Sequence, residues 1–305
     1  MKVLITGIYG QDGHLLSKIY KLKGNQVYGI VKDKKFKKIL YFKDLANKIY
    51  ENNLINIVKL VVNLIKIRPD VIIHFAAYNT GAGKNNNFFK YYLFNMICFI
   101  NIFFSFILCC RKSKFLFAGS AMMYSKKKFN IVDEKSNFSP VNAYGKYKYH
   151  SHNLMMFFKK IFKLNCTTLI LFNHDSKFRN ESFLFPRIVR SILTKNYSFL
   201  KKIIKSNLFL DISHAEDLCN LIYKISVSKK NHDKLILSSG KLSSVNKVIK
   251  KIFNNKKFFN KTSKANFGLV GNNMTIKKEF NYKPKKNISV ALKEIFISAK
   301  FDNKF

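Results

Sequence analysis

Three glycines stand directly between a short apolar run and a helical pattern at the start of the chain. The apolar run is residues 3–5, and the glycines are Gly7, Gly10 and Gly13. Gly7 permits a tight turn, Gly10 lets a pyrophosphate approach the backbone, and Gly13 lets the helix pack closely against the sheet. The amino end of that helix would face the phosphates. This order of strand, turn and helix predicts a dinucleotide-binding site, and it constrains the fold more than any other feature.

Apolar strand-like runs and amphipathic helical patterns alternate along the first 172 residues. The expected strands are 1–6, 26–31, 71–75, 114–118 and 167–172, and the expected helices are 13–22, 91–110 and 143–163. This alternation predicts an α/β fold, a Rossmann-type doubly wound parallel sheet. We expect an NAD(P)-binding domain at 1–172, with a returning segment near 207–238, and a smaller C-terminal substrate-binding region at 173–305, where the pattern loosens.

The charge of the chain is strongly positive but unevenly composed. Lys and Arg together number 56 against 16 acidic residues, a net charge of +40, yet only five of the cations are Arg. Base reading and bidentate phosphate recognition favour Arg, so this composition predicts a solvated Lys surface and no nucleic-acid partner. The five cysteines are scattered without a CxxC pair, which predicts neither disulfides nor a metal site and favours a cytoplasmic location.

Residues 91–110 contain no charge and are long enough to cross a membrane. Asn95, Asn101 and Ser105 interrupt the segment, and a polar amide is costly in lipid. We therefore expect a buried helix that packs on the sheet and on a partner subunit, with no membrane association. Together with the helix at 143–163 it would form the interface of a homodimer. Nothing at the N-terminus resembles a signal peptide.

Tyr144 and Lys148 lie four residues apart in a predicted helix, which puts their side chains on one face. A nearby ammonium lowers the pKa of a phenol, so Tyr144 could remove a proton from a sugar hydroxyl near neutral pH. Ser120 follows the strand at 114–118, where its hydroxyl could hydrogen-bond to the phenol and to a substrate. We interpret these three residues as the catalytic group.

The choice of cofactor depends on the end of the second strand. Asp33 could accept hydrogen bonds from a ribose diol, which favours NAD, whereas Lys32 and its neighbours could bind the 2′-phosphate of NADP. We expect NADP, with NAD as the alternative.

With these residues in view, the chain resembles the extended short-chain dehydrogenase/reductases that modify nucleotide sugars, and among them the GDP-mannose 4,6-dehydratases. Residues 6–13, 140–148 and 171–188 carry the resemblance. It implies further cofactor-binding residues: Gln11, Asp12, Asp44 and Leu45 (by the adenine), Ala76 and Ala77, Asn95 and His174. It implies that Asn173, Glu181 and Arg187 bind a nucleotide-sugar substrate, with GDP favoured as the nucleotide. Three of the five arginines fall within 179–190, as bidentate anion binding would require.

One departure from this family bears on the reaction. Met122 stands where these dehydratases carry a carboxylate that moves the C5 proton, and a thioether can neither take nor give a proton. Leu210 likewise stands where the family has an Arg. We expect an enzyme of the dehydratase type that oxidises sugar C4, in which ordinary dehydration requires Asp133 or Glu134 to replace the missing acid. The alternatives are a 4-ketoreductase or 4-epimerase, a non-catalytic dinucleotide-binding protein, and a basic membrane or nucleic-acid protein.

Overall fold

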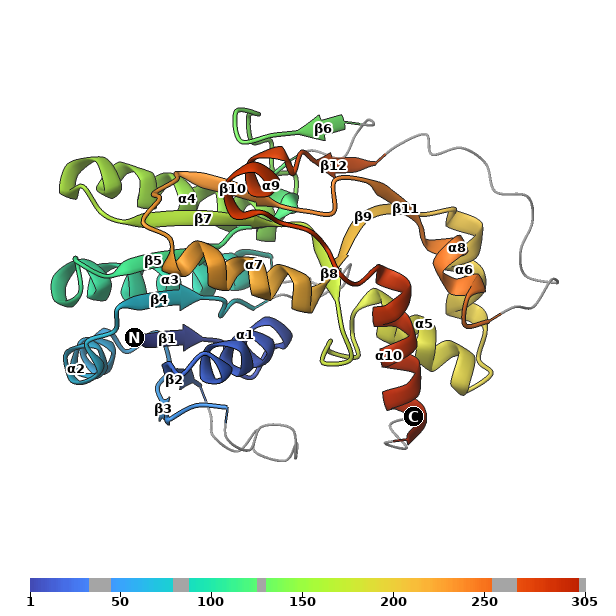
Figure 1. The fold of residues 1–305 in the computed structure, drawn as a ribbon, viewed down its shortest axis with the longest axis horizontal. Helices are drawn as coiled ribbons and strands as arrows, with labels where there is room; N and C mark the ends of the chain where they lie inside the picture. Colours follow the sequence, from blue (N-terminus) through green and yellow to red (C-terminus); the bar gives the residue numbers. More distant parts are fainter. Residues whose placement is uncertain (33–44, 79–87, 125–129, 254–267, 302–305) are drawn as a thin grey trace. The chain divides into compact units, whose positions relative to one another are not determined.

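A computed structural model describes residues 1–32, 45–78, 88–124, 130–253 and 268–301. The chain divides into two compact units. The first unit consists of Met1–Tyr124, Asn137–Ile170 and Cys219–Leu235, and the second of Ser125–Ser136, Leu171–Leu218 and Ile236–Phe305. Figure 1 follows the chain through both units in sequence colours.

A seven-stranded sheet forms the centre of the first unit, in the order β10-β7-β5-β4-β1-β2-β3. Its strands are β1 (Lys2–Thr6), β2 (Gln26–Val31), β3 (Lys48–Glu51), β4 (Val71–His74), β5 (Lys114–Ala118), β7 (Cys166–Leu171) and β10 (Lys234–Leu237). β1 pairs in parallel with β2 and β4, and the pairs β2–β3, β4–β5 and β5–β7 are parallel as well. The chain starts in the middle of the sheet and extends it in both directions, so the predicted doubly wound fold is confirmed.

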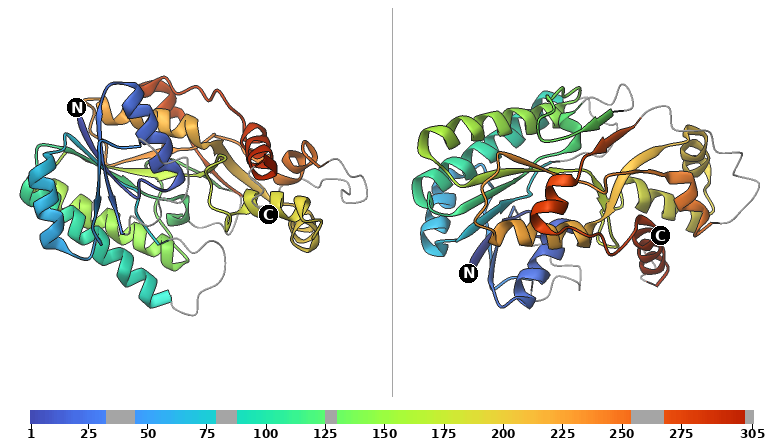
Figure 2. Two further views of the ribbon diagram at one scale, coloured as in Figure 1. Left: turned by 90° about the horizontal axis from the view of Figure 1, so that it is seen from below. Right: turned by 45° about the horizontal axis from the view of Figure 1, so that its top comes forward.

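Helices cover both faces of this sheet. α2 (Ile57–Ile67), α3 (Phe88–Cys109) and α4 (Ala143–Phe162) run side by side on one face, and α1 (Gln11–Leu22) and α7 (Ala215–Val227) cover the other, as Figure 2 shows. Tyr20 of α1 donates a hydrogen bond to Ser226 of α7 and packs edge-on against Tyr223. These helices cover the two faces of the sheet and leave the carboxyl ends of its strands for binding.

The segment that is long enough to cross a membrane is α3, the central helix of its layer. The most apolar 18-residue stretch of α3 has a mean hydropathy of 2.1, and 44% of that stretch is buried inside the protein. Phe99, Phe103 and Phe106 of α3 are fully buried and pack with Phe115 and Phe117 of β5. The expected packing of this helix on the sheet is confirmed, because its aromatic side forms the centre of the core.

The second unit is smaller and built from short elements. A three-stranded sheet contains β8 (Asn173–Asp175), β9 (Phe209–His214) and β11 (Leu242–Ser244), and a two-stranded one contains β6 (Asn130–Val132) and β12 (Leu269–Gly271). Its helices are α5 (Leu184–Leu193), α6 (Ser198–Ser206), α8 (Val245–Lys250), α9 (Met274–Phe280) and α10 (Ile288–Phe301). α10 and α5 pack together over a core that includes Phe185, Ile188 and Leu292.

Candidate active site

The glycine turn forms a tight cradle at the carboxyl end of β1. Gly7 has a φ of +74°, and a Cβ there would lie 2.9 Å from the backbone nitrogen of Ala76. A Cβ on Gly13 would lie 2.4 Å from the carbonyl oxygen of Gly7. Gly10 caps α1 without a side-chain hydrogen bond, so the first N–H groups of the helix face the turn. Side chains at these glycine positions would fill the turn. The open turn and the amino end of α1 together fit the pyrophosphate of a dinucleotide.

The order of the strands assigns other residues to the same edge of the sheet. Because parallel strands end at one edge, the residues that follow β2, β4 and β5 lie beside the glycine turn. They include Lys32, which is exposed, Ala76 and Ala77, and Ser120. Gln11 and Asp12 open α1 at this edge, and the Gln11 amide donates to the Asp12 carboxylate at 3.1 Å. Asp33 and Asp44 lie outside the described residues.

Leu45 lies at the opposite end of the sheet, where the strands have their amino ends. It precedes β3 and is buried near the amino end of that strand, where Asn47 accepts a hydrogen bond from the Val27 backbone. This position does not suit a residue beside the adenine, so we correct the expectation for Leu45. Residues 52–54 follow the carboxyl end of β3 and so lie at the end of the sheet that carries the glycine turn. These residues do not stand out in the sequence, because β3, Lys48–Glu51, has only four residues, with Ile49 and Tyr50 between two charged side chains and no alternation.

Asn95 on α3 holds the loop that follows β4. Its side-chain oxygen accepts the N–H of Tyr78 at 2.7 Å, and its side-chain nitrogen donates to the Tyr78 carbonyl at 3.1 Å. Both ends of the amide are therefore hydrogen-bonded to one backbone residue. We interpret Asn95 as a residue that positions the loop at Ala76 and Ala77 rather than as a direct contact of the cofactor.

Tyr144 and Lys148 lie in the first two turns of α4, as expected from their spacing. The ammonium nitrogen of Lys148 lies 5.4 Å from the ring centroid of Tyr144, 4.9 Å from that of Tyr147 and 4.7 Å from that of Phe117. Lys148 is 1% exposed, and this burial lowers its pKa to about 7. A cation held among aromatic rings beside the phenol is the arrangement that assists ionisation of Tyr144.

The loop that carries Ser120 packs against the start of α4. Residues Ala121–Met123 form a short 3-10 turn, and the Ser120 hydroxyl accepts the N–H of Met122 at 3.1 Å. Asn142 caps α4 by accepting the N–H of Gly145 at 2.8 Å, and its amide nitrogen lies 3.7 Å from the sulfur of Met122. Ser120, Met122 and Tyr144 therefore belong to two segments in direct contact.

The two acids that could replace the missing carboxylate are hydrogen-bonded within the second unit. Glu134 accepts the N–H of Ile236 and the hydroxyl of Thr275, both at 3.0 Å. Asp133 accepts from Ser136 and from the backbone of Lys135 and Ser136, and the Ser136 hydroxyl is the main cause that lowers the pKa of this carboxyl. These contacts oppose the use of either group as a mobile acid.

The substrate residues expected from the resemblance lie in the second unit. Asn173 donates to the carbonyl of Asp211 at 3.2 Å, and His174, which is buried, hydrogen-bonds through Nδ1 to the carbonyl of Phe172. The guanidinium of Arg187 lies 3.9 Å from the ring centroid of Phe199. Glu181 is exposed. The stacking of Arg187 on a ring leaves the edge of its guanidinium able to bind an anion.

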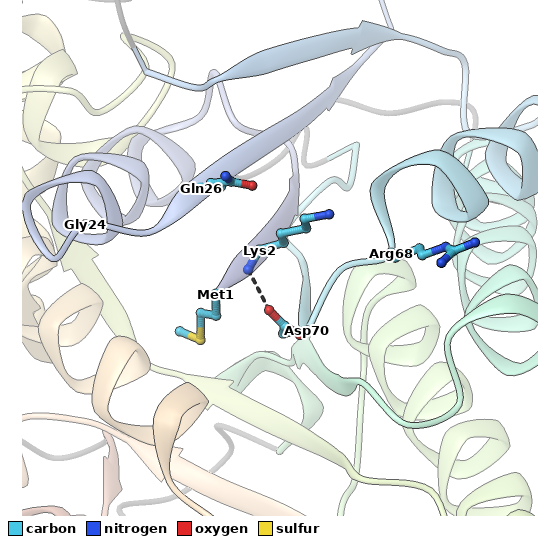
Figure 3. Close-up of a pocket in the computed structure, with 6 residues that line it drawn as sticks. All are labelled: Met1, Lys2, Gly24, Gln26, Arg68 and Asp70. Carbon is cyan, nitrogen blue, oxygen red and sulfur yellow. Dashed lines mark hydrogen bonds between the residues drawn. The ribbon is translucent and has the colours of Figure 1, made fainter.

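An open pocket of about 440 Å³ lies at the amino edge of the sheet, away from these groups. It is lined by Met1, Lys2, Gly24, Gln26, Arg68 and Asp70 (Figure 3). The N–H of Lys2 donates to Asp70 at 2.7 Å across it. Within the described ranges, no three His, Cys, Asp or Glu side chains group closely enough to hold a metal ion.

A family model described as GDP-mannose 4,6 dehydratase matches residues 4–287. The chain belongs to the GDP-mannose 4,6-dehydratase family. Its relatives include the GDP-mannose 4,6 dehydratases of Cricetulus griseus and Homo sapiens, each 26% identical over 269 residues, which cover 82% of this chain and 71% of the relative. The UDP-glucose 4-epimerase of Mycoplasma genitalium is 24% identical over 72% of this chain and 69% of its own.

Solved structures share the fold of this family member. The dTDP-glucose 4,6-dehydratase of Bacillus anthracis in complex with NAD has a TM-score of 0.83 at 16% identity and covers 100% of this chain and 98% of its own. The UDP-glucose 4-epimerase of Thermotoga maritima with UDP-glucose has a TM-score of 0.81 at 16% identity and covers both chains fully. The expected family is confirmed, and the chain is an enzyme of the nucleotide-sugar dehydratase and epimerase group.

Proposed function

We propose that the enzyme oxidises C4 of a nucleotide sugar, with Tyr144 as the base, in the manner of a GDP-mannose 4,6-dehydratase. The observation that carries the proposal is the fully buried ammonium of Lys148, 5.4 Å from the centroid of the Tyr144 ring on the same face of α4. An ammonium in a site of low dielectric stabilises a phenolate far more than it would in water. Tyr144 is therefore suited to remove a hydroxyl proton.

In this mechanism each side chain has one task. Tyr144 takes the proton of the sugar C4 hydroxyl, Lys148 stabilises the phenolate, and the Ser120 hydroxyl orients the sugar oxygen. A nicotinamide cofactor, when bound, would supply the acceptor for the hydride that leaves C4. Gly7, Gly10 and Gly13 would hold its pyrophosphate, since a Cβ at Gly7 or Gly13 would collide with backbone atoms. We propose NADP on account of Lys32 at the end of β2, with NAD as the alternative; structurally related enzymes have been solved with NAD.

For the substrate we propose a GDP-linked sugar, and GDP-mannose first. The family model and the Cricetulus griseus and Homo sapiens relatives, all described as GDP-mannose 4,6 dehydratases, support this choice. In the second unit, Arg187 supports binding of a diphosphate, because its planar guanidinium lies 3.9 Å from the centroid of the Phe199 ring, a contact that holds the group in place.

A second candidate is a nucleotide-sugar 4-ketoreductase or 4-epimerase, which Met122 favours. Both reactions use the hydride step at C4 and need no acid to expel the C6 hydroxyl. Met122 cannot supply a proton, and Asp133 and Glu134 accept several hydrogen bonds in the second unit. The UDP-glucose 4-epimerase of Mycoplasma genitalium among the relatives agrees with this candidate.

The deciding experiment incubates the enzyme with GDP-mannose and NADP or NAD and identifies the products by mass spectrometry. A dehydrated 4-keto-6-deoxy sugar supports the dehydratase, and a C4 epimer without loss of water supports the 4-epimerase. A 4-ketoreductase would instead oxidise NADPH or NADH when a 4-keto nucleotide sugar is supplied. A Tyr144→Phe variant should abolish either product and still bind the cofactor. Cofactor binding without any product, equal in both proteins, would instead indicate a non-catalytic dinucleotide-binding protein.

We further propose a cytoplasmic homodimer formed by α3 and α4. Both helices expose large apolar side chains away from the sheet, among them Phe89, Ile97, Phe157 and Ile161. Four-helix packing against a symmetry-related copy would bury them. The scattered free cysteines fit a reducing compartment.

A further inference from the structure

His74, the last residue of β4, joins the glycine turn to the loop that follows β4. Its side chain is fully buried, and its Nδ1 lies 2.7 Å from the hydroxyl oxygen of Thr6. That hydroxyl also accepts the N–H of Ala76 at 3.3 Å. Thr6 directly precedes Gly7, so one chain of hydrogen bonds connects the residues on either side of the cofactor cradle.

The other ring nitrogen of His74, Nε2, is buried and has no hydrogen-bond partner among the described residues. Leaving a buried polar atom unsatisfied is costly, and such atoms in native proteins usually indicate a water or a functional contact. The imidazole is stacked on the ring of Phe117, with 6.0 Å between centroids and 17° between planes. The ammonium of Lys148 lies 4.7 Å from the centroid of the same ring.

The ammonium of Lys148 lies beside the ring on which His74 stacks. An ammonium has three N–H donors, and in this site it is surrounded by the rings of Phe117, Tyr144 and Tyr147. Aromatic rings stabilise the charge but accept no strong hydrogen bond. The charge of Lys148 acts on His74, because together with burial, the larger cause, it lowers the pKa of the imidazole to about 3. The unpartnered Nε2 of His74 and the ammonium of Lys148 therefore lie beside the same aromatic ring, and the charge of Lys148 acts on the imidazole.

We propose that one buried water bridges Nε2 of His74 and the ammonium of Lys148, and that His74 is a positioning residue that keeps Lys148 charged. The bridge favours the ammonium in the tautomer whose Nδ1 carries the proton. In that tautomer Nδ1–H donates to the Thr6 hydroxyl oxygen, and the water donates to the bare Nε2 and accepts from Lys148. The hydroxyl of Tyr147, also buried and unpartnered in the described part of the chain, could supply a further contact.

The charge of Lys148 depends on what else surrounds it. The titratable groups of this core are Tyr144 and Tyr147 of α4, Cys98 of α3 and His74 of β4. Burial raises the pKa of Tyr147 and of Cys98, and burial together with Lys148 keeps His74 neutral, so none of these three compensates the ammonium near neutral pH. Hydrogen bonding to a water is then the interaction that favours the charged form of Lys148 before substrate and cofactor bind.

The test measures the protonation of Lys148 directly, without substrate or cofactor. In protein labelled with [13C]lysine, the Cε resonance that disappears in Lys148→Met is followed against pH. The His74→Phe variant keeps the stacked ring but has no Nε2, and we expect its titration midpoint to fall by about one pH unit, a tenfold weaker proton affinity. His74→Gln can place a polar atom near Nε2 and should restore most of the shift.

Thr6→Ser is the matched control, because it keeps the hydroxyl that binds Nδ1, and with it the tautomer, while it changes a side chain in contact with His74. Its midpoint should stay within a few tenths of a unit of the parent, and a high-resolution crystal structure of the parent should contain the water. Equal shifts in Thr6→Ser and His74→Phe, or no shift in His74→Phe, would overturn the proposal. The inference rests on the proposed role of Lys148, but the two fail separately, since the titration needs no activity and the product assay needs no water.

Discussion

Gly145 lies directly against the backbone of Met122. A Cβ built on Gly145 would stand 2.2 Å from the Met122 carbonyl oxygen, far inside van der Waals contact. The residue that follows Tyr144, the proposed base, must therefore lack a side chain if the Ser120 loop is to pack on α4. This contact fixes the distance between the two segments on which the proposed chemistry depends.

Replacing Gly145 with alanine should destabilise the protein, although Gly→Ala in a helix usually stabilises it. In the interior of a helix, Gly→Ala normally stabilises by up to about 1 kcal/mol. Here we expect a net destabilisation of about 1–3 kcal/mol from the steric clash, and a loss of activity because Tyr144 and Ser120 move apart. Urea unfolding and the product assay measure the two effects. Lys146→Ala, at the exposed neighbouring position, is the control and should change neither; a Gly145→Ala protein as stable and active as the parent would contradict the contact.

Introducing a carboxylate at Met122 should increase dehydration. Met122→Glu places an acid on the turn beside Ser120, where it can move the C5 proton and protonate the departing C6 hydroxyl. General acid–base assistance contributes roughly 10²–10⁴-fold, so we expect a gain of 4-keto-6-deoxy product of at least about tenfold. Met122→Gln has nearly the same shape without an ionisable group and should gain nothing. Equal rates for Glu and Gln variants would show that the missing acid does not limit the reaction.

The sequence predicted the sheet and the helix that carries Tyr144 and Lys148 because those features depend on local patterns. The glycine turn follows a buried strand directly, and Tyr144 and Lys148 are one helical turn apart, so their arrangement requires no long-range information. β3 was missed because an edge strand of four residues, Lys48–Glu51, needs only partial burial and has no continuous apolar run. With the strand missed, the adenine contact was assigned to Leu45 at the wrong end of it.

Other parts of the site depend on contacts between distant segments. Asn95 resembled a cofactor ligand by type, yet its amide is bonded to the Tyr78 backbone, seventeen residues earlier in the chain. The pairing of Thr6 with His74 spans 68 residues and follows from the register of β1 with β4. A single sequence cannot reveal such a register, so the role of His74 emerges only from the fold.

The burial of Lys148 should make stability depend on pH. The pKa of this group falls from 10.5 to about 7 in the folded protein, so between these values the unfolded chain binds a proton that the folded one does not. Stability should therefore rise with pH through this window, by about 2 kcal/mol from pH 7 to about 8.5. Urea unfolding of Lys148→Met should lack this component, and Lys146→Met at an exposed position should retain it. Parallel curves for parent and Lys148→Met would refute the burial of a charged group.

Arg187 should be sensitive even to replacement with lysine. Its guanidinium lies against the Phe199 ring, where it can present two parallel N–H groups to a diphosphate. Lys keeps the charge but loses the fork and the stacking, so Arg187→Lys should raise the KM for GDP-mannose about tenfold with little change in kcat. The same change at Arg190, three residues along α5 and also exposed, should have a smaller effect. Equal effects at the two positions would indicate general charge attraction.

The apolar outer face of α3 and α4 should control assembly. Phe157 on α4 is 59% exposed in the single chain, and Phe89 on α3 is 69% exposed; both point away from the core that Phe99 and Phe103 occupy. If two copies pack through these helices, Phe157→Asp would bury a carboxylate in an apolar interface, and its twofold mate would repeat the charge nearby. We expect sedimentation equilibrium to give a dimer for the parent and a monomer for Phe157→Asp. Leu22→Asp on α1, at a residue 77% exposed on the opposite face of the sheet, should remain dimeric. A parent that sediments as a monomer at all concentrations would exclude this interface.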